Sequence, residues 1–161
     1  MHEMLTLIMI CANTMPAQAA SGRSLSDCVE QVLPSVLDTY KAIHAAPELS
    51  HGEEKTAALV ARELKALGCD VFTGIGKFTR EEWKGHGVAG VLKNGPGPVV
   101  LIRAEMDALP ITEQTGLPYA SKVQAITDRG TKTGVMHACG HDLHTAAMLG
   151  TARLLADRKD R

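Results

Sequence analysis

The feature that most constrains the fold of this chain is a continuous apolar run, VVLIRA, at residues 99–104. A run without polar alternation is typical of a strand covered on both faces, as in an α/β sheet. Two shorter strands are expected before it, at residues 70–73 and 88–93, and NGPGP at 94–98 predicts a tight connection into the run. Because helical patterns flank these strands, we expect the α/β class.

Three helices are expected from apolar residues that recur with a helical period. The first spans residues 24–46 and is kinked or restarted at Pro34, which lacks the backbone donor that a helical turn needs. The second starts at a capping box, SHGE at 50–53, and stops at Gly68. The third covers residues 143–155.

The charge balance and composition exclude several classes of function. The chain has 17 Lys and Arg against 18 Asp and Glu, so it lacks the positive surplus of a nucleic-acid binder, and its 3% aromatic content offers few stacking platforms. No stretch approaches the roughly 20 apolar residues that span a bilayer. We therefore expect one packed domain with neither a nucleic-acid partner nor a membrane span.

The N-terminal segment reads as a secretory signal over residues 1–20. An apolar run at 5–12 is followed by a small-x-small cleavage site at 17–19. This predicts a secreted or periplasmic mature chain, residues 21–161. The start of the segment, residues 1–3, lacks the usual Lys or Arg, so a buried first strand or a misassigned start codon in a cytoplasmic protein stays open as the alternative.

Two carboxylates leave the carboxyl end of the apolar strand. Side chains alternate along a strand, so Glu105 and Asp107 are expected on the same side, where α/β sheets bind their ligands. The alternative is a solvated strand end in which Asp107 caps a turn.

The strongest chemical signal is the segment HACGHDLH at 137–144. Its histidine, cysteine and aspartate side chains suit a transition metal such as Zn²⁺, Mn²⁺ or Co²⁺. Cys139 and His141 flank Gly140, which permits a tight turn, so both can converge just before a helix whose N-terminus favours a thiolate. Further residues could add a ligand or support one: Glu105, His137, Asp142 and His144.

Other interpretations of this segment are weaker. The spacing fits no zinc finger, and a Cys–His nucleophile pair so close in sequence seldom reaches attack geometry. A thiol-redox role for Cys139 needs a resolving cysteine, whereas Cys28 and Cys69 are distant and read as small core residues. A structurally satisfied helix cap also stays open. The isolated histidines are expected to be surface or capping residues: His44, His51 and His86.

The sequence resembles the aminoacylase/hippurate-hydrolase family of metal-dependent amidohydrolases, which includes plant auxin-conjugate hydrolases and bacterial N-acyl-amino-acid hydrolases. The resemblance runs from about Val36 onward. Four segments carry it: AIHAAPELSHGEEKTA, GVAGVLKNGPGPVVLIRAEMDALP, the continuation ITEQTGLPYAS, and GVMHACGHDLHTAAMLGTARLL.

The resemblance implies a zinc-aminopeptidase-like catalytic domain, with helices packed on a mostly parallel or mixed sheet. It implies that Cys139 and His141 are metal ligands and that Asp107 is an acidic residue near the metals that positions a ligand or water. Two divalent ions (Mn, Zn or Co) would polarise the amide carbonyl of a small N-acyl amino acid and activate water, while a carboxylate takes the proton. Homodimers are common in the family.

The chain also departs from the family pattern. Glu105 stands where the family usually has Asp, and residues 77–84 look inserted. The family's general-base Glu, its other metal ligands and its lid and dimerisation domain come later than Arg161. We therefore expect an N-terminal portion of the catalytic domain, truncated and with little or no activity alone. The alternative is a non-catalytic metal- or partner-binding remnant.

Overall fold

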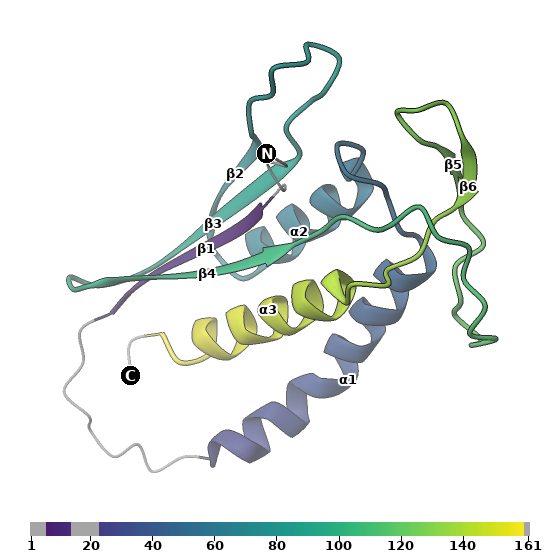
Figure 1. Ribbon diagram of the computed structural model, residues 1–161. Coiled ribbons are helices and arrows are strands. Elements are labelled where there is room, and N and C mark those ends of the chain that lie inside the picture. The colour runs from purple at the N-terminus through teal and green to yellow at the C-terminus, as the bar shows by residue number, and fades with distance from the viewer. Residues whose placement is uncertain (1–5, 14–22, 160–161) are drawn as a thin grey trace.

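The computed structural model describes residues 6–13 and 23–159 and packs three helices on a mixed sheet (Figure 1), which confirms the α/β class. The helices are α1 (Leu25–Ala45), α2 (Glu54–Ala66) and α3 (His141–Ala156). The strands are β1 (Thr6–Asn13), β2 (Asp70–Ile75), β3 (Gly87–Asn94), β4 (Val99–Glu105), β5 (Gln124–Ile126) and β6 (Lys132–Gly134).

The main sheet has the strand order β2-β3-β1-β4. Strand β1 pairs parallel with β3 and antiparallel with β4, while β2 pairs antiparallel with β3. The sheet is therefore mixed, as the resemblance implied. Strands β5 and β6 form a separate antiparallel hairpin that we did not predict.

The first strand coincides with the apolar part of the expected signal. Residues 6–13 form β1 in the middle of the sheet, which is the backbone arrangement that the buried-strand alternative describes. The expected cleavage site at 17–19 lies outside the described residues, as does the start of the chain. The signal and the boundary at residue 21 therefore stay predictions.

The ends of the helices correct one detail of the sequence analysis. A capping box is present, but it lies at the start of α1, where Ser24 Oγ accepts from Asp27 N and the Asp27 carboxylate accepts from Ser24 N. The box predicted at residues 50–53 is wrong. Helix α2 begins after Glu53 without a side-chain cap, because the Ser50 hydroxyl donates to Asp107 instead.

The apolar strand is also less covered than we predicted. Val99, Val100 and Leu101 are 62%, 56% and 54% exposed. Strand β4 is an edge strand, and helices α2 and α3 pack on only one face of the sheet, so only the second half of β4 reaches the core. The expectation that this run is covered on both faces is therefore wrong.

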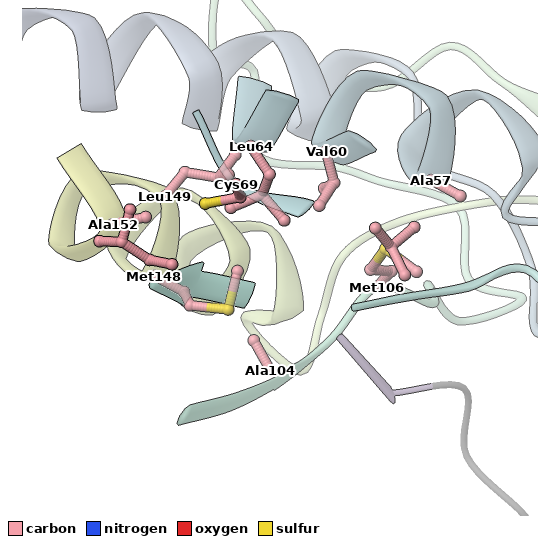
Figure 2. Packing of buried hydrophobic residues seen from close by; sticks show 11 residues of the cluster. Ala57, Val60, Leu64, Cys69, Ala104, Met106, Met148, Leu149 and Ala152 are labelled. Atoms are coloured by element: carbon pink, nitrogen blue, oxygen red, sulfur yellow. The ribbon is translucent and has the colours of Figure 1, made fainter. Parts of the chain in front are cut away.

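The core lies between the sheet and helices α2 and α3 (Figure 2). Cys69 belongs to it, as predicted, whereas Cys28 is half-buried beside Arg158. Helix α1 packs along α3, away from the sheet (Figure 1), and Gly150 permits this approach, since a Cβ there would lie 2.6 Å from Cγ2 of Val36. Within the described residues, no helix has the length and apolarity needed to cross a bilayer.

Candidate metal centre

Two segments that are distant in sequence meet at the candidate metal centre. Asp107 follows the end of β4 by two residues, and His141 is the first residue of α3. Gly140, the N-cap of α3, has a φ of 78°, a left-handed conformation that glycine adopts without strain, as the sequence predicted. The turn brings the His141 ring back to the end of the strand.

The contact between His141 and Asp107 determines which ring nitrogen can bind a metal. His141 Nδ1 lies 2.9 Å from Asp107 Oδ1 and 2.9 Å from the Asp107 carbonyl oxygen. Because both partners are acceptors, Nδ1 carries the proton, and the lone pair of Nε2 is left for a ligand. The Ser50 hydroxyl donates to Oδ2, so the buried Asp107 carboxylate is held at both oxygens.

Cys139 lies one residue before Gly140 and exposes its side chain. The Cys139 thiol is exposed and the His141 imidazole is partly exposed, so neither donor is sealed in apolar packing and each is accessible to an ion. No group of three histidine, cysteine or acidic side chains in the described part of the chain is placed to hold a metal. The structure thus brings together fewer than a full set of ligands.

His137 provides a test of whether the donors fit a metal. Its side chain is buried, and neither ring nitrogen has a hydrogen-bond partner among the described residues. Burial lowers the pKa of His137, so the ring is neutral at neutral pH, which is the form that ligates metals. A buried imidazole without partners is unusual and fits an incomplete site, so the residues present are compatible with a divalent ion.

The other candidate residues are placed differently. Asp142 is buried, its Oδ2 lies 2.6 Å from Nδ1 of His44, and its Oδ1 accepts from the Leu143 N–H. The Glu105 carboxylate pairs with Arg103 at 3.0 Å, whereas the Asp107 carboxylate contacts Ser50 and His141, so the two carboxylates have different partners. Strand β4 ends at Glu105, so the alternation expected along the strand does not extend to Asp107. His144 is exposed, with its ring centroid 6.1 Å from that of His141.

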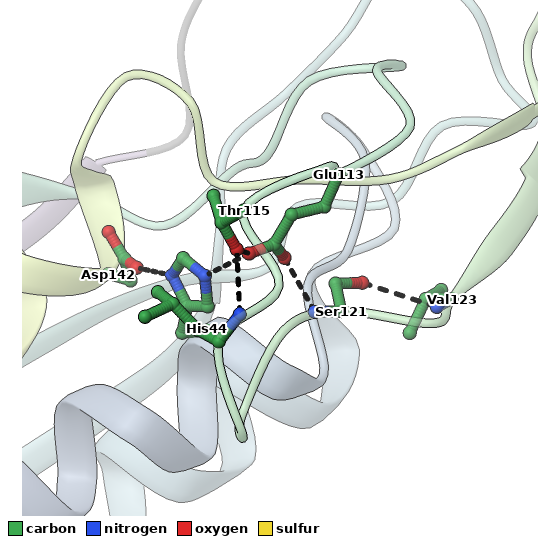
Figure 3. Close-up of polar contacts among 7 residues, drawn as sticks. His44, Glu113, Thr115, Ser121, Val123 and Asp142 are labelled. Atoms are coloured by element: carbon green, nitrogen blue, oxygen red, sulfur yellow. Dashed lines mark hydrogen bonds and ion pairs between the residues drawn. The ribbon is translucent and has the colours of Figure 1, made fainter.

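His44 is the main residue that the sequence analysis missed (Figure 3). It is buried between Asp142 and Glu113, which corrects its expected surface or capping role. Burial lowers the pKa of His44, but hydrogen bonds to Glu113 and Asp142 outweigh that effect, so the pKa is raised overall. No local pattern could reveal this, because the partners lie 69 and 98 residues away.

Glu53 is a second residue whose environment was missed. Its side chain is completely buried, and neither carboxylate oxygen has a hydrogen-bond partner among the described residues. Burial raises the pKa of Glu53 to about 7. The backbone at Glu53 and His51 opposes the rise, whereas the nearby charges of Asp107 and Glu48 add to it. At the start of a helix a glutamate suggests a cap, so the sequence offered no signal for this burial.

The segment at residues 77–84, which looks inserted, folds back on the connection between α1 and α2. The Trp83 ring stacks on His51 with centroids 3.8 Å apart, and Phe78 meets the same ring edge-on at 4.6 Å. His51 has a φ of 69°. His51 is thus packed against the loop rather than free on the surface, and it directly follows Ser50, the partner of Asp107.

Comparison with known proteins shows which family this part of the chain resembles. The family model described as Peptidase family M20/M25/M40 matches residues 101–161, which include β4 and α3. Thermostable carboxypeptidase 1 of Saccharolobus solfataricus is 41% identical over 84% of this chain and 31% of its own length. Hippurate hydrolase of Campylobacter jejuni is 42% identical over 79% of this chain and 31% of its own length.

A solved structure shows the same relationship. The YXEP protein of Bacillus subtilis, described as a dinuclear metal binding peptidase from the M20 family, has a TM-score of 0.57 and 31% identity, covering 84% of this chain and 33% of that one. The chain spans only about a third of the length of the proteins it matches.

Proposed function

We propose that this chain supplies metal ligands to a hydrolase of N-acyl amino acids. The premise is that it shares the sequence and fold of peptidase family M20/M25/M40 over the part that it has in common with its relatives. The proposed ligands are Cys139 and His141. The observation that carries the proposal is the contact of His141 Nδ1 with Asp107, because it leaves Nε2 for a metal.

The chain's own residues have defined tasks in this proposal. Asp107 keeps His141 in the tautomer that ligates through Nε2, and Ser50 holds the Asp107 carboxylate in place. His137, buried and neutral, is the candidate third ligand or a support for one. When bound, a divalent metal supplies an activated water and polarises the scissile carbonyl.

The proposed substrate class comes from the chemistry shared by two relatives. A carboxypeptidase and a hippurate hydrolase both cleave an amide whose nitrogen belongs to an amino acid with a free carboxylate. We therefore propose a small N-acyl amino acid as the substrate. The description of YXEP as dinuclear supports two metal ions in the longer proteins. Mn, Zn or Co as the identity of these ions, and a homodimer, are further proposals for those proteins.

The isolated chain of 161 residues is expected to show little or no turnover. A catalytic metal site needs about three protein ligands and an open position, and the described residues bring together no such set. Release of glycine from hippurate by the purified, metal-loaded chain would contradict this expectation. A metal-binding or partner-binding role without catalysis is the alternative, favoured by the exposed apolar edge of β4.

A chimeric protein tests the proposed function directly. Residues 23–161 replace the corresponding segment of Campylobacter jejuni hippurate hydrolase, and hippurate hydrolysis is measured after loading with Mn²⁺, Zn²⁺ or Co²⁺. We expect hydrolysis that Cys139→Ser and His141→Gln each abolish, while the Cys28→Ser control retains it. A folded chimera whose activity is unaffected by both ligand substitutions would contradict the proposal.

Export of the mature chain, from about residue 21, is likewise a proposal. The apolar run and the small-x-small site within residues 1–20 support it. Cleavage there would remove β1 from its place between β3 and β4, so the mature chain would need another strand at that position. Expression in a bacterial host, followed by fractionation and N-terminal sequencing, tests it. Periplasmic protein that begins near residue 20 or 21 is expected, whereas full-length protein confined to the cytoplasm would contradict it.

A further inference from the structure

One buried imidazole joins three segments at the candidate metal centre. His44 lies near the end of α1, Asp142 in the first turn of α3, and Glu113 in the loop that follows β4 (Figure 3). The distances are 2.6 Å from Nδ1 to Asp142 Oδ2 and 3.1 Å from Nε2 to Glu113 Oε1. Each ring nitrogen therefore serves a different element.

Both carboxylates are fixed by further contacts. Glu113 accepts a hydrogen bond from the Thr115 hydroxyl at Oε1 and another from the Ser121 N–H at Oε2. Asp142 accepts from the Leu143 N–H within the helix turn. Through these two carboxylates, His44 is connected to the backbone N–H of Ser121 in the loop and to that of Leu143 in α3.

The ring itself has little freedom to turn. Two tyrosines flank His44, with ring centroids 5.5 Å away for Tyr40 and 5.4 Å away for Tyr119. With two aromatic neighbours and two carboxylates, the ring has one orientation that satisfies all its contacts.

We propose that His44 is a positioning residue for the candidate metal centre: through Nδ1 it fixes Asp142 and with it the first turn of α3, and through Nε2 it fixes the loop at residues 113–123. His141 is the neighbour of Asp142 and shares that turn. The part of this inference that concerns metal binding rests on the proposed function, whereas the part that concerns positioning does not.

Two substitutions separate the two contacts of His44. In His44→Asn the side-chain amide nitrogen falls near the place of Nδ1, and in His44→Gln it falls near that of Nε2. His44→Asn keeps a donor for Asp142 and loses the contact with Glu113. His44→Gln keeps a donor for Glu113 and loses the contact with Asp142. Ile43→Val, which removes one methyl group from the buried neighbouring residue, is the matched control.

Hydrogen exchange of the full, metal-free chain measures the positioning. We expect His44→Asn to speed exchange in residues 113–123 and to spare residues 139–145, and His44→Gln to do the reverse. Glu113→Gln should reproduce the first pattern if an asparagine variant fails to fold. The same change in both segments for all variants, or a uniform rise like that of Ile43→Val, would overturn the proposal.

Cobalt titration of the same variants measures the effect on the metal. We expect His44→Gln to weaken Co²⁺ binding about tenfold, as removal of a group that orients a ligand does, and His44→Asn to leave it nearly unchanged. An equal loss of Co²⁺ affinity in both variants would contradict the proposal that the contact of His44 with Asp142 positions His141. If the unsubstituted chain binds no Co²⁺, the proposed function fails, and the exchange pattern alone decides the positioning role.

Discussion

Asp107 divides its two carboxylate oxygens between two segments of the chain. One oxygen contacts the His141 ring, and the other accepts a hydrogen bond from Ser50 in the connection before α2. A carboxylate in this position fixes the tautomer of the imidazole and makes Nε2 a stronger ligand. The chemistry of the site therefore depends on a residue that need not touch the metal.

Substitution of Asp107 tests this dependence. Asp107→Asn should weaken Zn²⁺ or Co²⁺ binding by about 10–100-fold, since the neutral amide orients and polarises His141 less. Competition with a chromophoric chelator measures the affinity. Glu105→Gln, at the same strand end but paired with Arg103, is the control and should bind as the unsubstituted chain does. Equal affinity for Asp107→Asn would contradict the role of the carboxylate.

Burial of Glu53 makes stability depend on pH. The pKa of Glu53 is raised from 4.5 to about 7 on folding, so between these values the folded chain holds a proton that the unfolded chain has released. Stability should therefore fall as pH rises through this range, by roughly 3 kcal/mol in all. Glu53→Gln should remove that fall.

Urea unfolding at pH 5 and pH 8 measures the difference. We expect the unsubstituted chain and the Glu54→Gln control, whose side chain is exposed, to lose more stability between these values than Glu53→Gln does. The same loss in all three proteins would show that Glu53 is not protonated in the folded chain.

At the scale of elements, the contact between α1 and α3 depends on Gly150. A methyl group there would lie 2.6 Å from Cγ2 of Val36, so the two helices would have to separate. Overpacking of this kind costs about 1–3 kcal/mol, which outweighs the gain in helix propensity from glycine to alanine. Gly150→Ala should therefore lower the free energy of unfolding.

A double-mutant cycle identifies the cause. Val36→Ala removes the clashing atom, so Gly150→Ala should cost less in that background than alone. Thermal unfolding of the four proteins gives the coupling. Strictly additive effects on the free energy of unfolding would mean that contact with Val36 is not the cause of the loss of stability in Gly150→Ala.

The helices and three of the six described strands, β2, β3 and β4, could be predicted because their signals are local. Periodicity located α1, α2 and α3, and Gly68, at a φ of 79°, ends α2 where expected. The exposure of Val99 could not be predicted in this way, since an edge strand and a central strand share the same apolar pattern. The short hairpin of β5 and β6 has too few residues to show alternation.

The same reasoning applies to the site. Cys139 and His141 lie two residues apart, so a motif could identify them. His44 and Glu53 could not be found, because their roles come from burial and from partners far along the chain. Charged side chains that are buried in the fold resemble surface residues in the sequence.

At the scale of the whole molecule, the sheet ends in an exposed apolar edge. Among the described residues, strand β4 has only β1 as a neighbour, and the face of the sheet away from α2 and α3 carries no helix. Leu101, 54% exposed, lies on this edge. An exposed apolar edge strand favours association between chains.

Leu101→Lys should reduce this association, because a charge on the edge strand opposes pairing. Light scattering and sedimentation at increasing concentration measure the effect. Ile126→Lys is the control, since Ile126 is 71% exposed on the separate β5–β6 hairpin, and it should change little. An equal reduction of association by both substitutions would show that an added charge opposes association whether or not it lies on strand β4.

The central claim is that this chain binds a divalent metal through Cys139 and His141. The most direct measurement is the Zn²⁺ content and Co²⁺ spectrum of the purified chain beside those of Cys139→Ser and the Cys69→Ser control. We predict bound metal with a cobalt–thiolate band in the unsubstituted chain and in the control, and loss of both in Cys139→Ser. Metal content and spectrum unchanged by Cys139→Ser would contradict the account.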